Sequence, residues 1–388
     1  MILIYNKVTM ESERINIQKE NIIWALNKAN IGTEAATKQF PFLQNVFDGK
    51  KEGTAKQYMS FCKAINVPFP YLLLSNPPSI DNQNVKFRTI ENKKNNSISS
   101  NLQNLIYDMQ YKQDWISDYR LNNDFNKVNF IKKFSNLVFD PVVLAEQVRA
   151  MLKLKINWFE DTLIKNNIFR YLREKMEGLG IIVMKGSVLN GNTHRIIELK
   201  ECRGFVLNDD YAPLIFINSR DDAHANTFTL LHEFIHLLYN DEQDIVDEQT
   251  DEESKINKIV SEVLLPSSCF NHQIRKYDSF RKVEISQIAN YFNSSLYSVA
   301  YKLYLIHKIS YDSLQVYKKK GATSSKSKNL KVNYYQVAAS KISTSFYLAV
   351  SDSLGNRSMN ICEGCKLLGI RPKGYVRFEK AMDKRLFK

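Results

Sequence analysis

Long hydrophobic runs are missing from this chain of 388 residues. No stretch approaches the roughly 18 uncharged residues of a membrane-spanning helix, so we expect no membrane partner. The first residues also lack the long apolar stretch and the small-residue cleavage site of a signal peptide. Both absences predict a cytoplasmic protein.

Cysteine, glycine and proline are scarce, with 5, 13 and 9 residues respectively. An odd number of cysteines spread over the length does not fit the disulfide framework of a secreted domain, so we expect reduced thiols. Few Gly and Pro residues exclude a largely disordered chain. Cys362 and Cys365 form a lone CxxC pair, which favours a structural role over a metal or redox site because no second pair lies nearby.

A dense basic block is also absent, although the formal net charge is +13. The lysines are scattered among asparagines and isoleucines, which favours a solvated basic surface over a polyanion-binding tract. The length of the chain is sufficient for two or three domains, each with a core of its own.

Changes in composition divide the chain into four predicted parts. Residues 1–85 have apolar positions at helical spacing and predict a compact helical unit, and residues 86–139 predict a helical linker region. Residues 140–320 alternate amphipathic helices with short β-branched runs, which predicts an α+β domain. Residues 321–388 begin with a polar, serine-containing segment and return to helical spacing. The expected fold class is α+β, predominantly helical, with a small sheet in the central domain.

The stretch HEFIHLL carries the strongest chemical pattern. His232, Glu233 and His236 are the polar positions of an otherwise apolar segment without Gly or Pro, which predicts a buried helix. Residues four apart lie about 40° apart around a helix, so both imidazoles can bind one ion. Glu233 can reach a water on that ion and is the predicted general base. The ligand types favour Zn²⁺, with Mn²⁺ or iron as alternatives.

A catalytic zinc usually has three protein ligands and one open position, so one more ligand is expected. The apolar spacing of Ile256 and Val260 places Glu253 on the inward flank of a predicted helix. Glu262 follows nine residues later, about half a turn away on the opposite face. Glu253 is therefore the predicted third ligand, and Glu252 is its close competitor.

Residues 203–240 and 252–266 resemble the ImmA/IrrE family of metallopeptidases. The shared features are an RGF run, a hydrophobic run ending in Ile-Asn, the FTLLHEFIH stretch, and Glu253 four residues before Asn257 in a segment ending in Leu-Leu-Pro. The resemblance implies that residues 140–320 form a zincin-like zinc metallopeptidase domain with the same four site residues, and that residues 1–85 form a helix-turn-helix-like domain. It also implies that the run Leu214–Asn218 aligns the substrate backbone by edge addition.

Residues 22–78 resemble the repressor-type helix-turn-helix that precedes the peptidase in longer members of this family. The final stretch CKLLGIRPKGYVRFEK is similar to the family's accessory helices. The resemblance implies cleavage of a transcriptional repressor or similar regulator, in mobile elements or stress-response loci, with DNA as a partner of the N-terminal unit. The alternative is a DNA-binding regulator or antitoxin-like protein whose peptidase fold serves as a sensing or docking module.

The spacing leaves the oxyanion-stabilising residue open among three candidates, Tyr239, Arg203 and Tyr211. His224 precedes the predicted zinc helix, and it is either a surface residue or part of the cleft wall.

Overall fold

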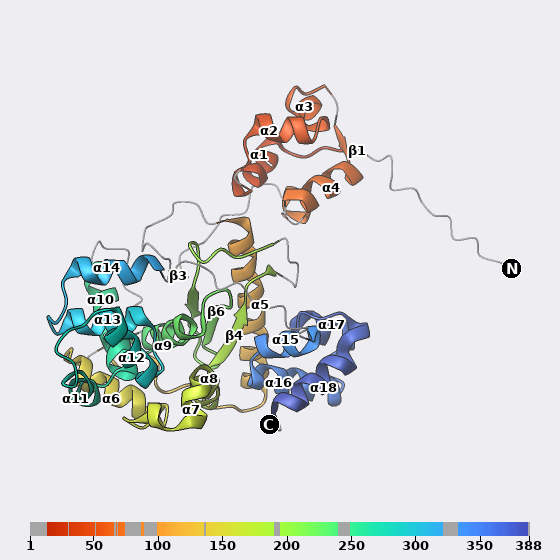
Figure 1. Ribbon diagram of the computed structural model, residues 1–388. Helices are drawn as coiled ribbons and strands as arrows, with labels where there is room; N and C mark the ends of the chain where they lie inside the picture. Colours follow the sequence, from red (N-terminus) through yellow and green to blue (C-terminus); the bar gives the residue numbers. More distant parts are fainter. Residues whose placement is uncertain are drawn as a thin grey trace. The chain divides into compact units, whose positions relative to one another are not determined.

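The computed structural model describes residues 14–29, 31–50, 52–65, 67, 69–73, 87–88, 99–135, 137–189, 195–239, 249–320 and 333–386 (Figure 1). The chain forms two compact units, one of Met1–Asn84 and Lys94–Leu105 and the other of Val85–Lys93 and Ile106–Lys388. Residues 89–98 of the predicted linker region, and the polar segment that begins the predicted part 321–388, lie outside the described residues. The four-part division remains a prediction.

The first unit is a small helical bundle with one short strand pair. Tyr58 and Phe61 are fully buried at its centre, and the ring of Phe42 meets Tyr58 edge-on at 5.3 Å. The antiparallel pairing of β1 with β2 links the start of this unit to the start of α4. Its elements are β1 (Arg14–Ile15), α1 (Lys19–Lys28), α2 (Thr33–Gln39), α3 (Phe42–Phe47), β2 (Gly53–Thr54), α4 (Ala55–Ile65) and the 3-10 helix η1 (Phe69–Leu73).

The second unit is mostly helical and contains a four-stranded sheet, which confirms the predicted fold class. Helix α5 (Ser100–Asn122) belongs to this unit from Ile106 onward. The next helices are α6 (Pro141–Met151), η2 (Trp158–Glu160), α7 (Thr162–Asn166) and α8 (Ile168–Gly178). The later helices are α9 (Ala223–Tyr239), α10 (Gln249–Leu264), α11 (Ser267–Ile274), α12 (Lys282–Phe292), α13 (Leu296–Leu305), α14 (Tyr311–Lys320), α15 (Tyr334–Lys341), α16 (Thr344–Gly355), α17 (Ile361–Leu367), η4 (Pro372–Gly374) and α18 (Tyr375–Leu386).

The sheet has the strand order β3 (Phe87–Arg88), β5 (Gly204–Leu207), β6 (Leu214–Asn218) and β4 (Ile182–Gly186). Strand β6 pairs parallel with β4 and antiparallel with β5, and all of its residues are buried. The prediction that Leu214–Asn218 receives a substrate backbone by edge addition is therefore wrong. Both hydrogen-bonding sides of β6 are already occupied, and the edges belong to β3 and β4.

Helix α9 packs against β5 and β6 at the centre of the second unit (Figure 1). The side chain of Asp222 caps its start by accepting hydrogen bonds from the backbone N–H groups of His224 and Ala225, both at 2.9 Å. Leu230, Leu231, Phe234, Ile235, Leu237 and Leu238 are fully buried on it. A helix this apolar on every side is a core helix, so its polar residues lie inside the protein.

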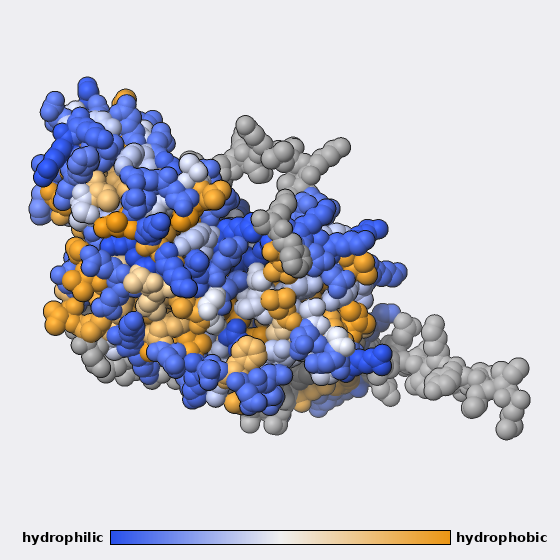
Figure 2. Space-filling model, turned by 90° about the horizontal axis from the view of Figure 1, so that it is seen from below, coloured by the Kyte–Doolittle hydropathy of each residue, from blue (hydrophilic) through white to orange (hydrophobic). Residues whose placement is uncertain are grey.

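Exposed large apolar side chains are spread over several segments, and examples are Val138, Leu163, Val283 and Val376. On the face drawn in Figure 2, hydrophobic residues lie between hydrophilic ones. Single exposed apolar residues are normal on a folded protein and do not by themselves mark a docking site. Among the described residues, no helix combines the length and the apolar character that crossing a bilayer requires.

Candidate metal centre

The two histidines predicted to bind a metal lie on successive turns of α9. Their Nε2 atoms are 3.0 Å apart, and their side chains are 0% and 15% exposed for His232 and His236. Helical geometry alone produces this approach, because a spacing of four residues places both imidazoles on one face. The buried helix therefore presents two ring nitrogens to a single point.

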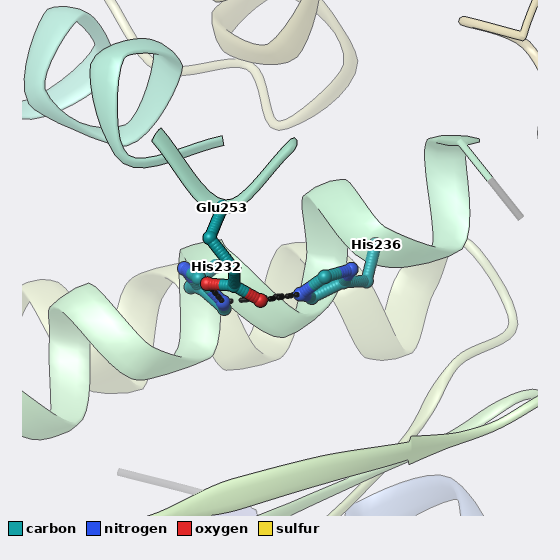
Figure 3. Close-up of side chains that lie close together, drawn as sticks. All are labelled: His232, His236 and Glu253. Carbon is teal, nitrogen blue, oxygen red and sulfur yellow. Dashed lines mark hydrogen bonds and ion pairs between the residues drawn. The ribbon is translucent and has the colours of Figure 1, made fainter. Parts of the chain in front are cut away.

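Glu253 reaches the same point from α10 (Figure 3). Its Oε2 atom lies 3.3 Å from Nε2 of His232, and its Oε1 atom lies 3.4 Å from Nε2 of His236. Helix α10 is oriented by Ile256, which is fully buried on its inner side. Among the described residues the cluster of metal-ligating side chains consists of His232, His236 and Glu253, so the competitor Glu252 is not brought into it.

The spacing of these donor atoms fits a small divalent ion. Zinc binds nitrogen and carboxylate oxygen at about 2.0 to 2.1 Å, and tetrahedral ligands at that distance lie about 3.3 to 3.4 Å from one another. The three separations found here are 3.0, 3.3 and 3.4 Å. Two imidazoles and one carboxylate form a donor set that leaves the fourth tetrahedral position to water or substrate.

Electrostatics keep the carboxylate of this cluster ionised. Burial alone would raise the pKa of Glu253, but hydrogen bonds to His232 and His236 and their charges outweigh burial. The pKa of Glu253 therefore lies well below its usual range. An ionised carboxylate is the form that binds a metal.

Asn257 orients the first histidine. Its Oδ1 atom lies 3.2 Å from Nδ1 of His232. An amide oxygen only accepts hydrogen bonds, so Nδ1 carries a proton and Nε2 is the ring nitrogen that faces the cluster. In the sequence, Asn257 stands out only as part of the family pattern. Its position four residues after Glu253 nevertheless places both residues on one face of α10.

Glu233 is 2% exposed on the sheet side of α9. Its Oε1 atom would lie 3.0 Å from a Cβ atom at Gly204, and the Cγ2 atom of Thr229 would lie 2.7 Å from the same Cβ. Strand β5 can therefore approach α9 this closely only because Gly204 has no side chain. Gly204 is the glycine of the RGF run, but nothing in the spacing of that run predicts that it lies against Glu233.

Cys202 is fully buried near Glu233. Burial, and then the charge of Glu233, raise the pKa of the Cys202 thiol well above its usual range. A thiol held in its protonated form is a poor nucleophile and a poor metal ligand. Cys202 is thus a packing residue beside the site.

The candidate oxyanion residues make contacts of other kinds. Arg203 Nη1 lies 3.5 Å from Asp221 Oδ2, the ammonium of Lys127 lies over the Tyr211 ring, and the Tyr239 ring packs edge-on against Phe134 at 5.7 Å. His224 is partly buried at the start of α9 and is not part of the metal-ligating cluster among the described residues.

The extent of the site along the chain can be compared with known families. Residues 176–304 match the family model described as the IrrE N-terminal-like domain. The IrrE N-terminal-like segment contains β4, β5, β6, α9 and α10, and hence every residue of the cluster. The match supports a metallopeptidase-type function, which implies a divalent metal ion and a protein substrate. It does not extend to residues 22–78. A search of curated proteins found no match to the chain.

Proposed function

We propose that the chain is a zinc-dependent endopeptidase with His232, His236 and Glu253 as metal ligands and Glu233 as the general base. The observation that carries this proposal is the convergence of three donor atoms at 3.0 to 3.4 Å from two helices. Mn²⁺ is the alternative ion, because it accepts the same nitrogen and oxygen donors.

The chemistry divides between the ion and the protein. A zinc ion in such a site lowers the pKa of coordinated water to about 7 and polarises the scissile carbonyl. Glu233, next to the first ligand in the sequence and almost fully buried, takes the proton of the attacking water and returns it to the leaving amine. Asn257 keeps His232 in the orientation and tautomer that ligation needs.

The proposed substrate is a transcriptional repressor or a similar regulatory protein. The support is the resemblance of residues 22–78 to a repressor-type helix-turn-helix, together with the order of α1 to α4 in a compact unit of its own. DNA is the second partner proposed for that unit. A pull-down with the Glu233→Gln protein that recovers no regulator among its bound proteins would contradict this substrate class.

The first experiment measures bound zinc and cleavage together for three variants. We expect Glu233→Gln to retain zinc and lose at least about a hundredfold in cleavage rate, because general base catalysis contributes roughly 10² to 10⁴. Glu253→Gln should lose zinc. Glu252→Gln, the matched control on the preceding residue, should keep both zinc and cleavage.

Two results for the variants would decide against the proposal. Full cleavage by Glu233→Gln with zinc bound would show that Glu233 is not the general base. Unchanged zinc content in Glu253→Gln would show that Glu253 is not a metal ligand. A wild-type protein that binds zinc yet cleaves no candidate regulator, while binding duplex DNA through residues 22–78, would instead favour the DNA-binding regulator.

A further inference from the structure

The C-terminal helices α15 to α18 pack together and end in a helix-turn-helix. Helix α16 is followed by α17, and α17 is joined to the next helix through residues 368–371 alone. The second helix of the pair begins as η4 and continues directly as α18, so it runs from 372 to 386. Two helices joined by a turn of three or four residues are the motif by which many proteins enter the DNA major groove.

The turn between these helices is built from specific residues. Gly369 has a φ of +65°, and its N–H donates to the carbonyl of Lys366 at 3.1 Å. The N–H of Ile370 donates to the carbonyl of Cys365 at 3.0 Å. These two bonds form a Schellman motif, which ends a helix at a residue in the left-handed region. Pro372 then starts the next helix, a position that proline favours.

The inner side of the second helix is fixed in a core. Phe378 and Met382 are fully buried, and the Phe378 ring packs edge-on against Tyr347 of α16 at 6.0 Å. A Cβ atom at Gly364 of α17 would lie 3.0 Å from Cδ1 of Leu354, so α16 and α17 are also in close contact. The opposite side of the second helix is therefore held outward.

That outer side carries a stripe of positive charge. Lys373, Arg377, Lys380 and Lys384 are all exposed, and the three that lie in α18 fall within roughly 60° of the helix circumference at about 100° per residue. Within the part of the chain that the structure describes, none of the four forms an ion pair with an acidic side chain.

Two acidic residues lie on the same helix. Glu379 is partly buried, whereas Asp383 is exposed three residues after Lys380, so one carboxylate flanks the four cations. Val376 is 59% exposed beside Arg377. Cations with one apolar residue at their side suit a groove lined by phosphates and thymine methyl groups.

We propose that residues 372–386 are a recognition helix that binds the major groove of double-stranded DNA. The four cations contact phosphates, and Val376 faces the base edges. This binding site is separate from the metal centre and from the N-terminal unit. It adds a DNA-binding activity to the proposed peptidase.

The test is fluorescence anisotropy of the full chain with a labelled DNA duplex of mixed sequence, over a range of salt concentrations. Wild type should bind, with an affinity that falls steeply with salt. We expect the double variant Arg377→Ala, Lys380→Ala to bind at least about tenfold more weakly. Its slope of log affinity against log salt should be smaller by about 2, since each lost phosphate contact removes about 0.9.

A matched control removes one Arg and one Lys from exposed positions elsewhere in the same unit, as Arg275→Ala, Lys282→Ala. This control should bind the duplex like wild type, and both double variants should unfold at the wild-type temperature. Absence of duplex binding by wild type at low salt would overturn the proposal. Equal affinities of the two double variants for duplex DNA would overturn it too. So would binding of single-stranded DNA or heparin that is as tight as duplex binding and is weakened as much by Arg377→Ala, Lys380→Ala.

Discussion

At the scale of single residues, the candidate site depends on contacts that fix the ligands before any ion binds. His232 is fully buried, so its ring can turn only as far as its neighbours allow. The hydrogen bond from its Nδ1 to Asn257 selects one orientation and one tautomer. Histidine ligands generally depend on such partners for a large part of their metal affinity.

Replacement of Asn257 should therefore weaken metal binding without removing a ligand. We expect Asn257→Leu to raise the zinc dissociation constant roughly 10 to 100-fold, because the ring loses its acceptor and its fixed tautomer. Competition with a coloured chelator measures this constant directly. Asn257→Asp keeps an acceptor oxygen and should restore most of the affinity. Zinc binding by the Leu variant as tight as wild type would show that Asn257 has no positioning role.

At the scale of elements, local periodicity predicted the helices of the site and the faces of their residues, because both depend on neighbours in the sequence. The apolar run around His232 predicted the buried helix α9, and the spacing of Ile256 and Val260 favoured Glu253 over Glu262. In the structure Glu262 indeed points elsewhere, since its carboxylate forms a buried ion pair with Lys302 of α13 and accepts a hydrogen bond from the backbone of Ser267. The choice between Glu253 and Glu252 needed the fold, because both begin the same helix.

Features that depend on distant pairing were not predictable in this way. The edge-addition hypothesis for β6 failed because a strand's place in a sheet is set by partners such as Ile182, which is more than thirty residues away in the chain. The close approach of Gly204 to Glu233 likewise joins a strand and a helix. Hydrophobic runs identify strands, but their order arises from tertiary packing.

Strand β4 also carries a lysine in an unfavourable position. Burial, with a smaller effect from Arg173, lowers the pKa of Lys185 to about 8, and its ammonium lies 4.4 Å from the centroid of the Phe169 ring. An unfolded lysine has a pKa of about 10.4, so between about pH 8 and 10.4 the unfolded chain binds more protons. The stability of the folded state must then rise with pH across this window.

We accordingly expect Lys185→Met to stabilise the protein at pH 7, by on the order of 2 kcal/mol. The gain over wild type should shrink as the pH approaches 10, where wild-type Lys185 has already lost its proton in the folded state. Urea unfolding at both pH values measures the difference. The exposed control Lys200→Met should show little change at either pH. A gain that grows with pH would contradict the assigned direction.

At the scale of the whole molecule, the C-terminal helices are joined to helix α8 and strand β4 through a buried arginine of α8. Arg173 is 4% exposed and donates to the carbonyl oxygens of Val183 and Ser340, each at 2.7 Å, and of Ile342 at 2.5 Å. Glu177 accepts from Arg173 Nε at 3.0 Å and from the backbone N–H of Thr344 at 3.1 Å. One ion pair thus links α8, β4 and the segment between α15 and α16.

Loss of Arg173 should loosen the C-terminal helices before the rest of the protein. Arg173→Met removes a donor from the carbonyls of Val183 and Ser340 and the ion-pair partner of the buried Glu177, whereas Ile342 keeps its hydrogen bond from Arg385, so we expect a loss of about 3 to 5 kcal/mol. Hydrogen exchange should accelerate in residues 333–386 and stay unchanged in residues 14–65. The control Arg220→Met breaks a half-exposed pair with Glu198 elsewhere in the same unit and should cost less than about 1 kcal/mol. If both variants exchange alike, the ion pair is not what holds the basic helix 372–386 on the molecule, and its attachment must come from apolar packing alone.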